Sequence, residues 1–152
     1  MVALATQPPL GMGVVFTDGS RLDNGQAGAG YSILIPGWPK ELHADPLGVC
    51  DNNEAELEAI CRSLRRITHR HKEGWRGTAI LFSDSAGCLG YLMRGWRIAV
   101  RQGLARETRR LYHRVSNLCR FRMYWIRGHA GVPGNEEVDG LAKKGSGKRG
   151  AR

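Results

Sequence analysis

The amino-acid sequence predicts an α/β protein (an α+β mixed sheet) in which five strands are flanked by helices. Two observations lead to this prediction. Short runs of strand-forming residues and longer runs with helical periodicity follow one another in the order βββαβ(α)αβα. In addition, the run Thr78 to Asp84 is apolar at nearly every position, as expected for a strand that is covered on both faces.

Five segments have the pattern of strands, and the first three are expected to form a hairpin-linked antiparallel set. Val14 to Asp18 ends at a turn region rich in Gly and Asn, and Tyr31 to Pro36 is stopped by proline. The third segment, residues 41–50, contains Pro46, which has no N–H for the sheet and therefore indicates a position near a sheet edge. The last two strands are predicted at Thr78 to Asp84 and Phe121 to Ile126.

Four segments favour helices. Apolar residues recur at helical spacing over residues 57–67, and the asparagines at 52–53 are expected to supply the N-cap. Residues 86–93 predict a short helix that two glycines weaken, and residues 104–119 predict an amphipathic helix with arginines on its outer side. A final helix is expected to be capped by Asn135.

The chain length and charge suggest one domain with an anionic partner. The 152 residues divide into a flexible leader (1–11), a folded domain (12–144) and a basic tail (145–152) that should be disordered in isolation. The net charge of +9 comes mainly from arginine, and phosphate is the usual partner of such a surface. A protein that is merely basic and soluble is the alternative, which charge alone leaves open.

Several classes of protein are disfavoured by simple counts. None of the four cysteines forms a C-x-x-C pair, so neither a zinc site nor a disulfide framework is indicated. No run of 18 apolar residues suggests a membrane span, and the first residues lack the pattern of a signal peptide. We therefore expect an intracellular protein, in the nucleus or the cytoplasm, that is not secreted and has no membrane partner.

Two predicted strands end on an aspartate. Asp18 closes the run before Gly19, and Asp84 closes the run Leu81 to Ser83 with the same Phe-hydroxyl-Asp order. An ionised carboxylate is costly to bury unless it is paired or coordinates a metal. If the two strands are parallel neighbours, both carboxylates lie at the sheet edge where ligands tend to bind.

Two helical acids could join them. Glu56 precedes Leu57 and Asp139 follows Val138, so each acid lies at the border of an apolar stripe and can point toward the sheet. Four converging carboxylates repel one another unless divalent cations lie between them. Mg²⁺ prefers oxygen ligands, and two such ions can hold the attacking and leaving oxygens of a phosphodiester displacement.

Each acid also has a simpler interpretation. Taken alone, Asp18 is better explained by an Asx turn with Gly19, and Asp84 is equally well explained as the start of a helix. Glu56 could complete a capping box with Asn53, and Asp139 could be a solvated acid of a polar helix. The joint order of the four residues, rather than any single one, favours a metal site.

The motifs in which these acids lie resemble those of type 1 ribonuclease H domains, which cut the RNA strand of RNA–DNA hybrids. The matching segments are FTDGS, NNEAEL, FSDS and GHAGVPGNEEVDGLAK, in the order of the family and across nearly all of residues 12–144. The last segment is the most specific of the four. The stretch WIRGHAGVPGNEEVDGLAK is most similar to the ribonuclease H domains of non-LTR retrotransposons.

This resemblance implies a ribonuclease H-like fold and a set of site residues. The metal-binding acids of the family fall on Asp18, Glu56, Asp84 and Asp139, and its mobile catalytic histidine falls on His129. The residues that contact the hybrid fall on Asn24, Asn52 and Asn53. Without the motif around it, His129 would be interpreted as an exposed loop residue, and Asn53 as a helix cap.

The chain also departs from the family pattern. Asp51 stands where many relatives carry Thr, which removes one hydroxyl contact to a phosphate, and Ala86 stands where cellular enzymes often carry Gln. The interval between Asp84 and His129 is too short for a full basic-protrusion helix of the bacterial type. No N-terminal hybrid-binding domain of the eukaryotic kind is recognisable in these 152 residues.

A second set of arginines is predicted to replace the missing protrusion. Seven arginines and one acid lie between Arg94 and Arg114, with Trp96 among them. We expect Trp96, Arg97 and Arg101 to contact the sugar–phosphate backbone of the substrate. For the other arginines of this segment, a solvated helix face is the alternative.

Taken together, the sequence predicts a hydrolase that binds two Mg²⁺ ions, with Mn²⁺ as the alternative metal. It would cleave the RNA strand of an RNA–DNA hybrid endonucleolytically and leave 5′-phosphate and 3′-hydroxyl ends. We expect a monomer that is part of a retroelement and acts beside a reverse transcriptase of the same polyprotein. The main alternative is a catalytically silent module of the same fold that only binds nucleic acid or acts as a scaffold.

Overall fold

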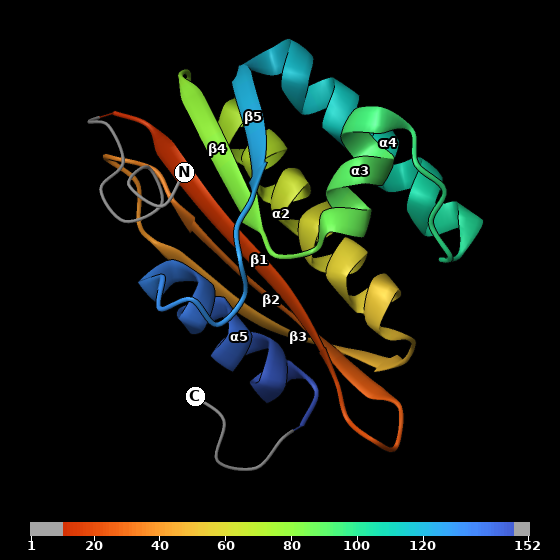
Figure 1. The fold of residues 1–152 in the computed structure, drawn as a ribbon. Coiled ribbons are helices and arrows are strands. Elements are labelled where there is room, and N and C mark those ends of the chain that lie inside the picture. Colours follow the sequence, from red (N-terminus) through yellow and green to blue (C-terminus); the bar gives the residue numbers. More distant parts are fainter. Residues whose placement is uncertain (1–10, 148–152) are drawn as a thin grey trace.

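The computed structural model describes residues 11–147 as one mixed sheet with helices on both faces (Figure 1). The strands follow the spatial order β3-β2-β1-β4-β5. Their bounds are β1 Gly13–Arg21, β2 Gln26–Leu34, β3 Glu41–Val49, β4 Thr78–Ser83 and β5 Arg120–Trp125. The helices are α2 Asn52–Lys72, α3 Ala86–Arg94, α4 Gln102–Leu118 and α5 Pro133–Gly145.

The strand directions place two predicted acids at the same edge of the sheet. β1, β2 and β3 form the expected antiparallel set, whereas β4 runs parallel to both β1 and β5. Phe16 of β1 is opposite Phe82 of β4, and Thr17 is opposite Ser83. Asp18 and Asp84 follow these pairs, so they lie side by side where the pairing of β1 with β4 ends. β1 itself does not stop at Asp18 as predicted but continues to Arg21, paired with β2.

Two apolar cores lie on opposite faces of the sheet. The larger one joins the sheet to α2, α3 and α4, and it includes Val15 of β1 and Leu81 of β4. The smaller one lies under α5 and includes Phe16 and Phe82, which are stacked with ring centroids 5.2 Å apart. Successive residues of β1 and β4 point alternately into the two cores, so both strands are apolar at nearly every position.

Glycines in β2 let α5 approach the sheet very closely. A Cβ atom on Gly30 would lie 2.3 Å from the carbonyl oxygen of Val138, and one on Gly28 would lie 2.2 Å from the amide nitrogen of Ser146. Because glycine has no side chain at these two positions, the backbone of α5 can lie directly against β2. Gly30 is paired with Asp18 of β1, so this contact sets the distance between α5, which carries Asp139, and Asp18.

Two predicted helix caps were wrong. The N-cap of α2 is Asp51, whose carboxylate accepts a hydrogen bond of 2.8 Å from the amide of Glu54. The asparagines at 52–53 therefore lie inside the first turn. In α5 the N-cap is Val132 with Pro133 in the first turn, and Asn135 is a buried residue of the helix. Proline fits the first turn because its missing N–H has no helical partner there.

The interrupted third strand lies at the sheet edge, as predicted. β3 continues through Pro46, and the pairing with β2 shifts register between Ala27 and Gly28, opposite this proline. An edge strand tolerates proline because one side of its backbone needs no hydrogen bonds to the sheet.

The ends of the chain are only partly covered by the structure. Most of the expected leader, residues 1–10, lies outside the described residues, as do residues 148–152 of the expected tail. Within the described part, α5 extends to Gly145 and the side chain of Ser146 is buried. Within residues 11–147, no helix combines the length and the apolar character that crossing a membrane requires.

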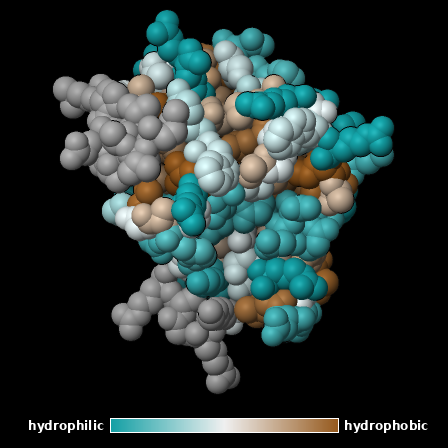
Figure 2. Space-filling view, in the orientation of Figure 1, coloured by the Kyte–Doolittle hydropathy of each residue, from teal (hydrophilic) through white to brown (hydrophobic). Residues whose placement is uncertain are grey.

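The surface in the orientation of Figure 1 has only small hydrophobic patches, which hydrophilic side chains separate (Figure 2). The large apolar side chains that are exposed, Leu34, Leu42, Val49, Met93, Trp96 and Trp125, come from several different elements. Scattered apolar residues of this kind are normal for a folded protein surface.

The contact between α5 and β2 leads to a testable prediction. Gly30→Ala should lower the free energy of unfolding by about 1–3 kcal/mol, because the added methyl group overlaps the backbone of α5. The matched control is Gly87→Ala at an exposed position of α3, where a Cβ atom meets nothing within 4 Å and alanine favours the helix. Urea denaturation of both variants checks this, and equal stability of the two variants would contradict the proposed contact.

Candidate active site

A pocket of about 310 Å³ opens beside Asp18 and Gly19 of β1 and at the end of β4. Residues from five separate parts of the chain line it, and they include all four acids that the sequence singled out. They are Asp18, Gly19, Asn52, Asn53, Glu56, Asp84, Ser85, His129 and Asp139. The fold therefore brings together residues that are as much as 121 positions apart in the sequence.

Gly19 joins the first two acids. Its amide donates hydrogen bonds to Glu56 Oε1 at 2.8 Å and to Asp18 Oδ1 at 2.9 Å. A Cβ atom on Gly19 would lie 2.5 Å from the amide nitrogen of Glu56, so only glycine lets β1 touch the first turn of α2. This close approach holds Glu56 beside Asp18, and it excludes Glu56 from the capping box that was its alternative interpretation.

Asp84 is positioned by the loops around it. The indole nitrogen of Trp125 donates to the carbonyl oxygen of Asp84 at 3.0 Å. The amide of Ser85 donates to the hydroxyl oxygen of Ser83 at 3.0 Å. A Cβ atom on Gly128 would come within 2.7 Å of Asp84 Oδ2, so the loop after β5 passes directly against the carboxylate.

The last helix contributes a second acidic group. Asp139 Oδ2 lies 2.9 Å from Lys143 Nζ, one helical turn further along α5. His129, Glu136 and Asp139 each place a ligand atom within 4.8 Å of the others. His129 is exposed and has a φ of 55°, a left-handed conformation that is uncommon for a residue other than glycine.

The acids at the base of the pocket are crowded and buried. Asp18, Glu56 and Asp84 each place a carboxylate oxygen within 4.8 Å of the others. Burial, together with the negative charges of Asp84 and Asp139, raises the pKa of Asp18 to about 7, against the lowering effect of hydrogen bonds with Glu56 and Gly19. Burial and the neighbouring Asp18 raise the pKa of Glu56, and burial raises that of Asp84. Proximity of like charges and loss of water both disfavour the ionised forms.

The donor set fits divalent cations that prefer oxygen ligands. Glu56 Oε2 is buried and has no hydrogen-bond partner in the described chain. An unpaired buried carboxylate oxygen is unfavourable, and a metal ion would both satisfy it and reduce the repulsion between the acids. The three carboxylates supply hard ligands with space beside them for water and substrate oxygens, as Mg²⁺ requires.

The three predicted hybrid-binding asparagines are placed differently. Asn52 and Asn53 line the pocket at the first turn of α2. Asn24 lies in the turn between β1 and β2, where its side-chain oxygen accepts a hydrogen bond from the amide of Gln26. Asn24 is exposed and is not among the residues that line this pocket.

The predicted aromatic and arginine contacts lie in the segment between α3 and α4, outside the pocket. The ring of Trp96 covers Gly90, where a Cβ atom would come within 1.9 Å of it, and the guanidinium of Arg94 lies over the same ring. Arg101 forms an ion pair with Glu54 at 3.0 Å, and Arg97 is exposed.

Several residues that shape the site were not predicted. Gly19, Ser85, Trp125, Gly128 and Lys143 each contact an acid or the loop that carries it. Only Lys143 had a usable sequence signal, namely its spacing of four residues from Asp139, which places the two on one helix face. The other contacts depend on the packing of distant segments.

The crowding of the acids predicts an unusual dependence of stability on pH. The folded-state pKa of Asp18 lies above the ordinary value of 3.8, so its effect favours folding at low pH and is lost as pH rises to about 7. In EDTA, the free energy of unfolding should therefore fall between pH 4 and pH 8. Asp18→Asn should raise it at pH 8 by roughly 1–3 kcal/mol.

Urea denaturation at the two pH values measures this effect. Asp23→Asn, which removes an exposed acid from the nearby turn, is the matched control and should keep the pH dependence of the parent. If Asp18→Asn also kept that dependence, the carboxylate would not be destabilised by its surroundings.

Comparison with known proteins agrees with this geometry. The family model described as RNase H matches residues 12–147. The ribonuclease H of Acidovorax sp. is 32% identical over 146 residues, which cover 87% of this chain and 93% of that protein. The ribonuclease H of Saccharomyces cerevisiae is 28% identical over 161 residues, and this match covers 89% of the chain but only 46% of the yeast protein.

Solved structures share the fold. RNase H1 from Halobacterium salinarum superposes with a TM-score of 0.68 at 21% identity, covering 89% of this chain and 97% of that one. LC11-RNase H1, isolated from compost, superposes with a TM-score of 0.70 at 20% identity, covering 91% and 98%. The predicted ribonuclease H-like fold is thus confirmed. With the family model matched over almost all described residues, the chain belongs to the ribonuclease H family as a type 1 domain.

Proposed function

We propose that this protein hydrolyses the RNA strand of RNA–DNA hybrids endonucleolytically, with two Mg²⁺ ions, and leaves 5′-phosphate and 3′-hydroxyl ends. One observation carries the proposal. Three carboxylates lie within 4.8 Å of one another at the base of an open pocket, and one of their buried oxygens has no partner in the described chain. Membership of the ribonuclease H family supplies the reaction class.

The acids would divide the metal ligation between them. Asp18, Glu56 and Asp84 would hold one ion, and Asp18 with Asp139 would hold the other. Bound divalent ions lower the pKa of a coordinated water and stabilise the oxygen that leaves. Gly19 holds Glu56 and Asp18 in place through its amide, so the ligands are oriented before substrate arrives.

Asp139 can keep its ion pair with Lys143 and still bind a metal in this proposal. In the structure its carboxylate is paired with Lys143 at 2.9 Å, and its side chain is partly exposed. A carboxylate has two oxygens and can accept from lysine with one while it contacts a metal with the other. Lys143 would then orient Asp139 rather than compete with the metal.

His129 would transfer a proton or assist product release. It is exposed and lines the pocket, on a loop between Gly128 and Gly131. Histidine is the side chain that most often transfers protons in catalysis. Glu136 and Asp139 each place a carboxylate oxygen within 4.8 Å of a nitrogen of its ring.

Recognition of the hybrid would use the pocket rim and the segment after α3. Asn52 and Asn53 line the pocket beside the acids and would contact the sugars of the RNA strand. The 2′-hydroxyl is the group that distinguishes RNA from DNA. Asn24, Trp96, Arg97 and Arg101 would contact the backbone further out. Since Arg101 is already paired with Glu54, Arg97 is the better candidate for a phosphate contact.

The biological setting is part of the proposal. We infer a domain of a retroelement of the non-LTR kind that acts as a monomer beside a reverse transcriptase, with Mn²⁺ as an alternative metal and a nuclear or cytoplasmic location. The silent module of the same fold remains the second candidate, and the presence of all four acids in one pocket favours the enzyme.

A cleavage assay separates these two candidates. A hybrid with labelled RNA should be cut in Mg²⁺ and not in EDTA, and Asp84→Asn should reduce the rate by more than about 100-fold. Loss of residues that only support metal ligands typically costs 10–100-fold, and a direct ligand should cost more. Asp23→Asn is the matched control. Tight binding of the hybrid without metal-dependent cleavage by the parent protein would support the silent module.

Arg97 and Arg101 can be tested through salt dependence. Arg97→Ala should flatten the log–log salt dependence of hybrid affinity by about one unit, as loss of one phosphate contact does. Arg101→Ala should flatten it less, since Glu54 already compensates its charge. Fluorescence anisotropy with Asp84→Asn as the parent protein measures both slopes, with the exposed Arg120→Ala as control. Unchanged slopes for both variants would remove this segment from the binding surface.

A further inference from the structure

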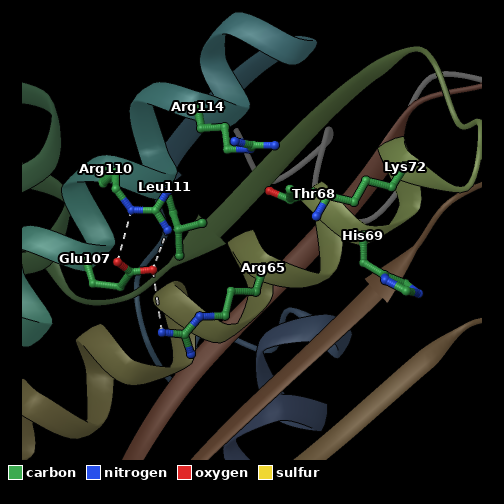
Figure 3. Close-up of a pocket in the computed structure, with 8 residues that line it drawn as sticks. All are labelled: Arg65, Thr68, His69, Lys72, Glu107, Arg110, Leu111 and Arg114. Carbon is green, nitrogen blue, oxygen red and sulfur yellow. Dashed lines mark hydrogen bonds and ion pairs between the residues drawn. The ribbon is translucent and has the colours of Figure 1, made fainter.

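A second groove of about 370 Å³ lies between α2 and α4, away from the acidic pocket (Figure 3). Four of its residues come from each helix: Arg65, Thr68, His69 and Lys72 from α2, and Glu107, Arg110, Leu111 and Arg114 from α4. Figure 3 shows the side chain of Arg114 extending from α4 toward α2. Five of the eight residues are arginine, lysine or histidine.

The same spacing occurs on both helices. In each set the residues recur at i, i+3, i+4 and i+7, which places them on one face of the helix. The two faces look toward each other because α2 and α4 pack side by side. The groove is thus a regular feature of two helix surfaces rather than a chance gap.

Positive charge dominates the groove. Glu107 is its only acid, and it is already paired with Arg110 at 2.7 Å and with Arg65 at 3.8 Å. Lys72 and Arg114 are both exposed, and neither forms an ion pair with any residue in the range 11–147. Two cations are therefore free to bind an anion without breaking an existing contact.

The groove is distinct from the acidic pocket. Glu56 belongs to the first turns of α2, whereas the groove begins at Arg65 and ends at Lys72 of the same helix. At a rise of 1.5 Å per residue these positions lie about 14 and 24 Å from Glu56 along the helix. A ligand confined to this groove would not contact the four acids of the pocket.

We propose that this groove binds the phosphodiester backbone of a nucleic acid. Arginine suits phosphate because its planar guanidinium can donate two parallel hydrogen bonds, and several cations in a row match the repeating charge of a strand. A protein partner fits less well, because the only large apolar residue of the groove, Leu111, is 4% exposed. Protein interfaces usually depend on exposed apolar or aromatic anchors.

Two sources of this backbone are compatible with the groove. One is a distal part of the same hybrid that occupies the acidic pocket, which rests on the proposed function. At 3.4 Å per nucleotide, a hybrid must extend about 7 base pairs to cover 24 Å. The other source is a separate single strand, which does not depend on cleavage.

The decisive variant is Lys72→Gln combined with Arg114→Gln, because it removes two unpaired charges and leaves the pairs of Glu107 intact. Its matched control is Arg106→Gln combined with Arg122→Gln, which removes two exposed charges from α4 and β5 outside the groove. A third protein, Lys72→Arg with Arg114→Lys, keeps the charges. Thermal unfolding of all three checks that each variant is folded.

Binding is measured by fluorescence anisotropy in EDTA over a salt series, so that cleavage plays no part. The probes are a single-stranded DNA of about 20 nucleotides, a hybrid of about 6 base pairs and a hybrid of about 20 base pairs. The two hybrids are chosen to fall short of and to reach Lys72, since 6 base pairs span about 20 Å. Poly-glutamate is the protein-like probe.

The proposal predicts that the Gln variant lowers the log–log salt slope by about one to two units, from two lost contacts at 0.7–0.9 each. The charge-preserving variant and the control should keep the slope of the parent. A change with the long hybrid alone identifies the distal part of the substrate, and a change with single-stranded DNA identifies a separate strand.

Two results would overturn the proposal. One is an unchanged slope for every nucleic acid, and the other is a loss of poly-glutamate binding alone, which would indicate an acidic protein partner. Because no arm requires hydrolysis, failure of the groove is distinguishable from failure of the proposed function.

Discussion

Electrostatic repulsion among buried carboxylates is the constraint on which the rest of this structure depends. Asp18 and Glu56 are almost fully buried, and Asp84 lies within 4.8 Å of both. Against this repulsion the described chain supplies one shared backbone donor, the amide of Gly19. The surrounding fold must therefore hold β1, β4 and α2 together by other means. The two apolar cores and the parallel pairing of β1 with β4 provide that stability.

Much of this arrangement could be predicted from the sequence because it depends on local periodicity. The apolar runs located the strands, and Asp18 and Asp84 indicated the sheet edge at which the pocket opens, although β1 continues past Asp18 to Arg21. The helix caps could not be assigned, because Asp51, Asn52 and Asn53 are all good capping residues and only the geometry shows that Asp51 is used. The second groove could not be foreseen either, since it requires α4 to lie beside the C-terminal half of α2.

The start of α2 also explains a departure from the family pattern. Asp51 caps the helix, and Glu54 in the same turn forms an ion pair with Arg101. Two acids thus occupy a surface where the resemblance implies a contact to phosphate. The position of Arg101 compensates one of these charges, so this edge of the pocket is closer to neutral than its sequence suggests. Contacts to the substrate backbone would then depend more on residues elsewhere on the positively charged surface.

The outer edge of β3 has a consequence for self-association. An exposed sheet edge can pair with a strand of another molecule and so begin aggregation. Here Pro46 lacks an N–H group, and the register shift opposite it makes the edge irregular. Gly48 has a φ of 72°, which bends the strand further away from an extended path. A second molecule would find no regular row of donors and acceptors along this strand, so growth of the sheet into intermolecular aggregates is disfavoured at this edge.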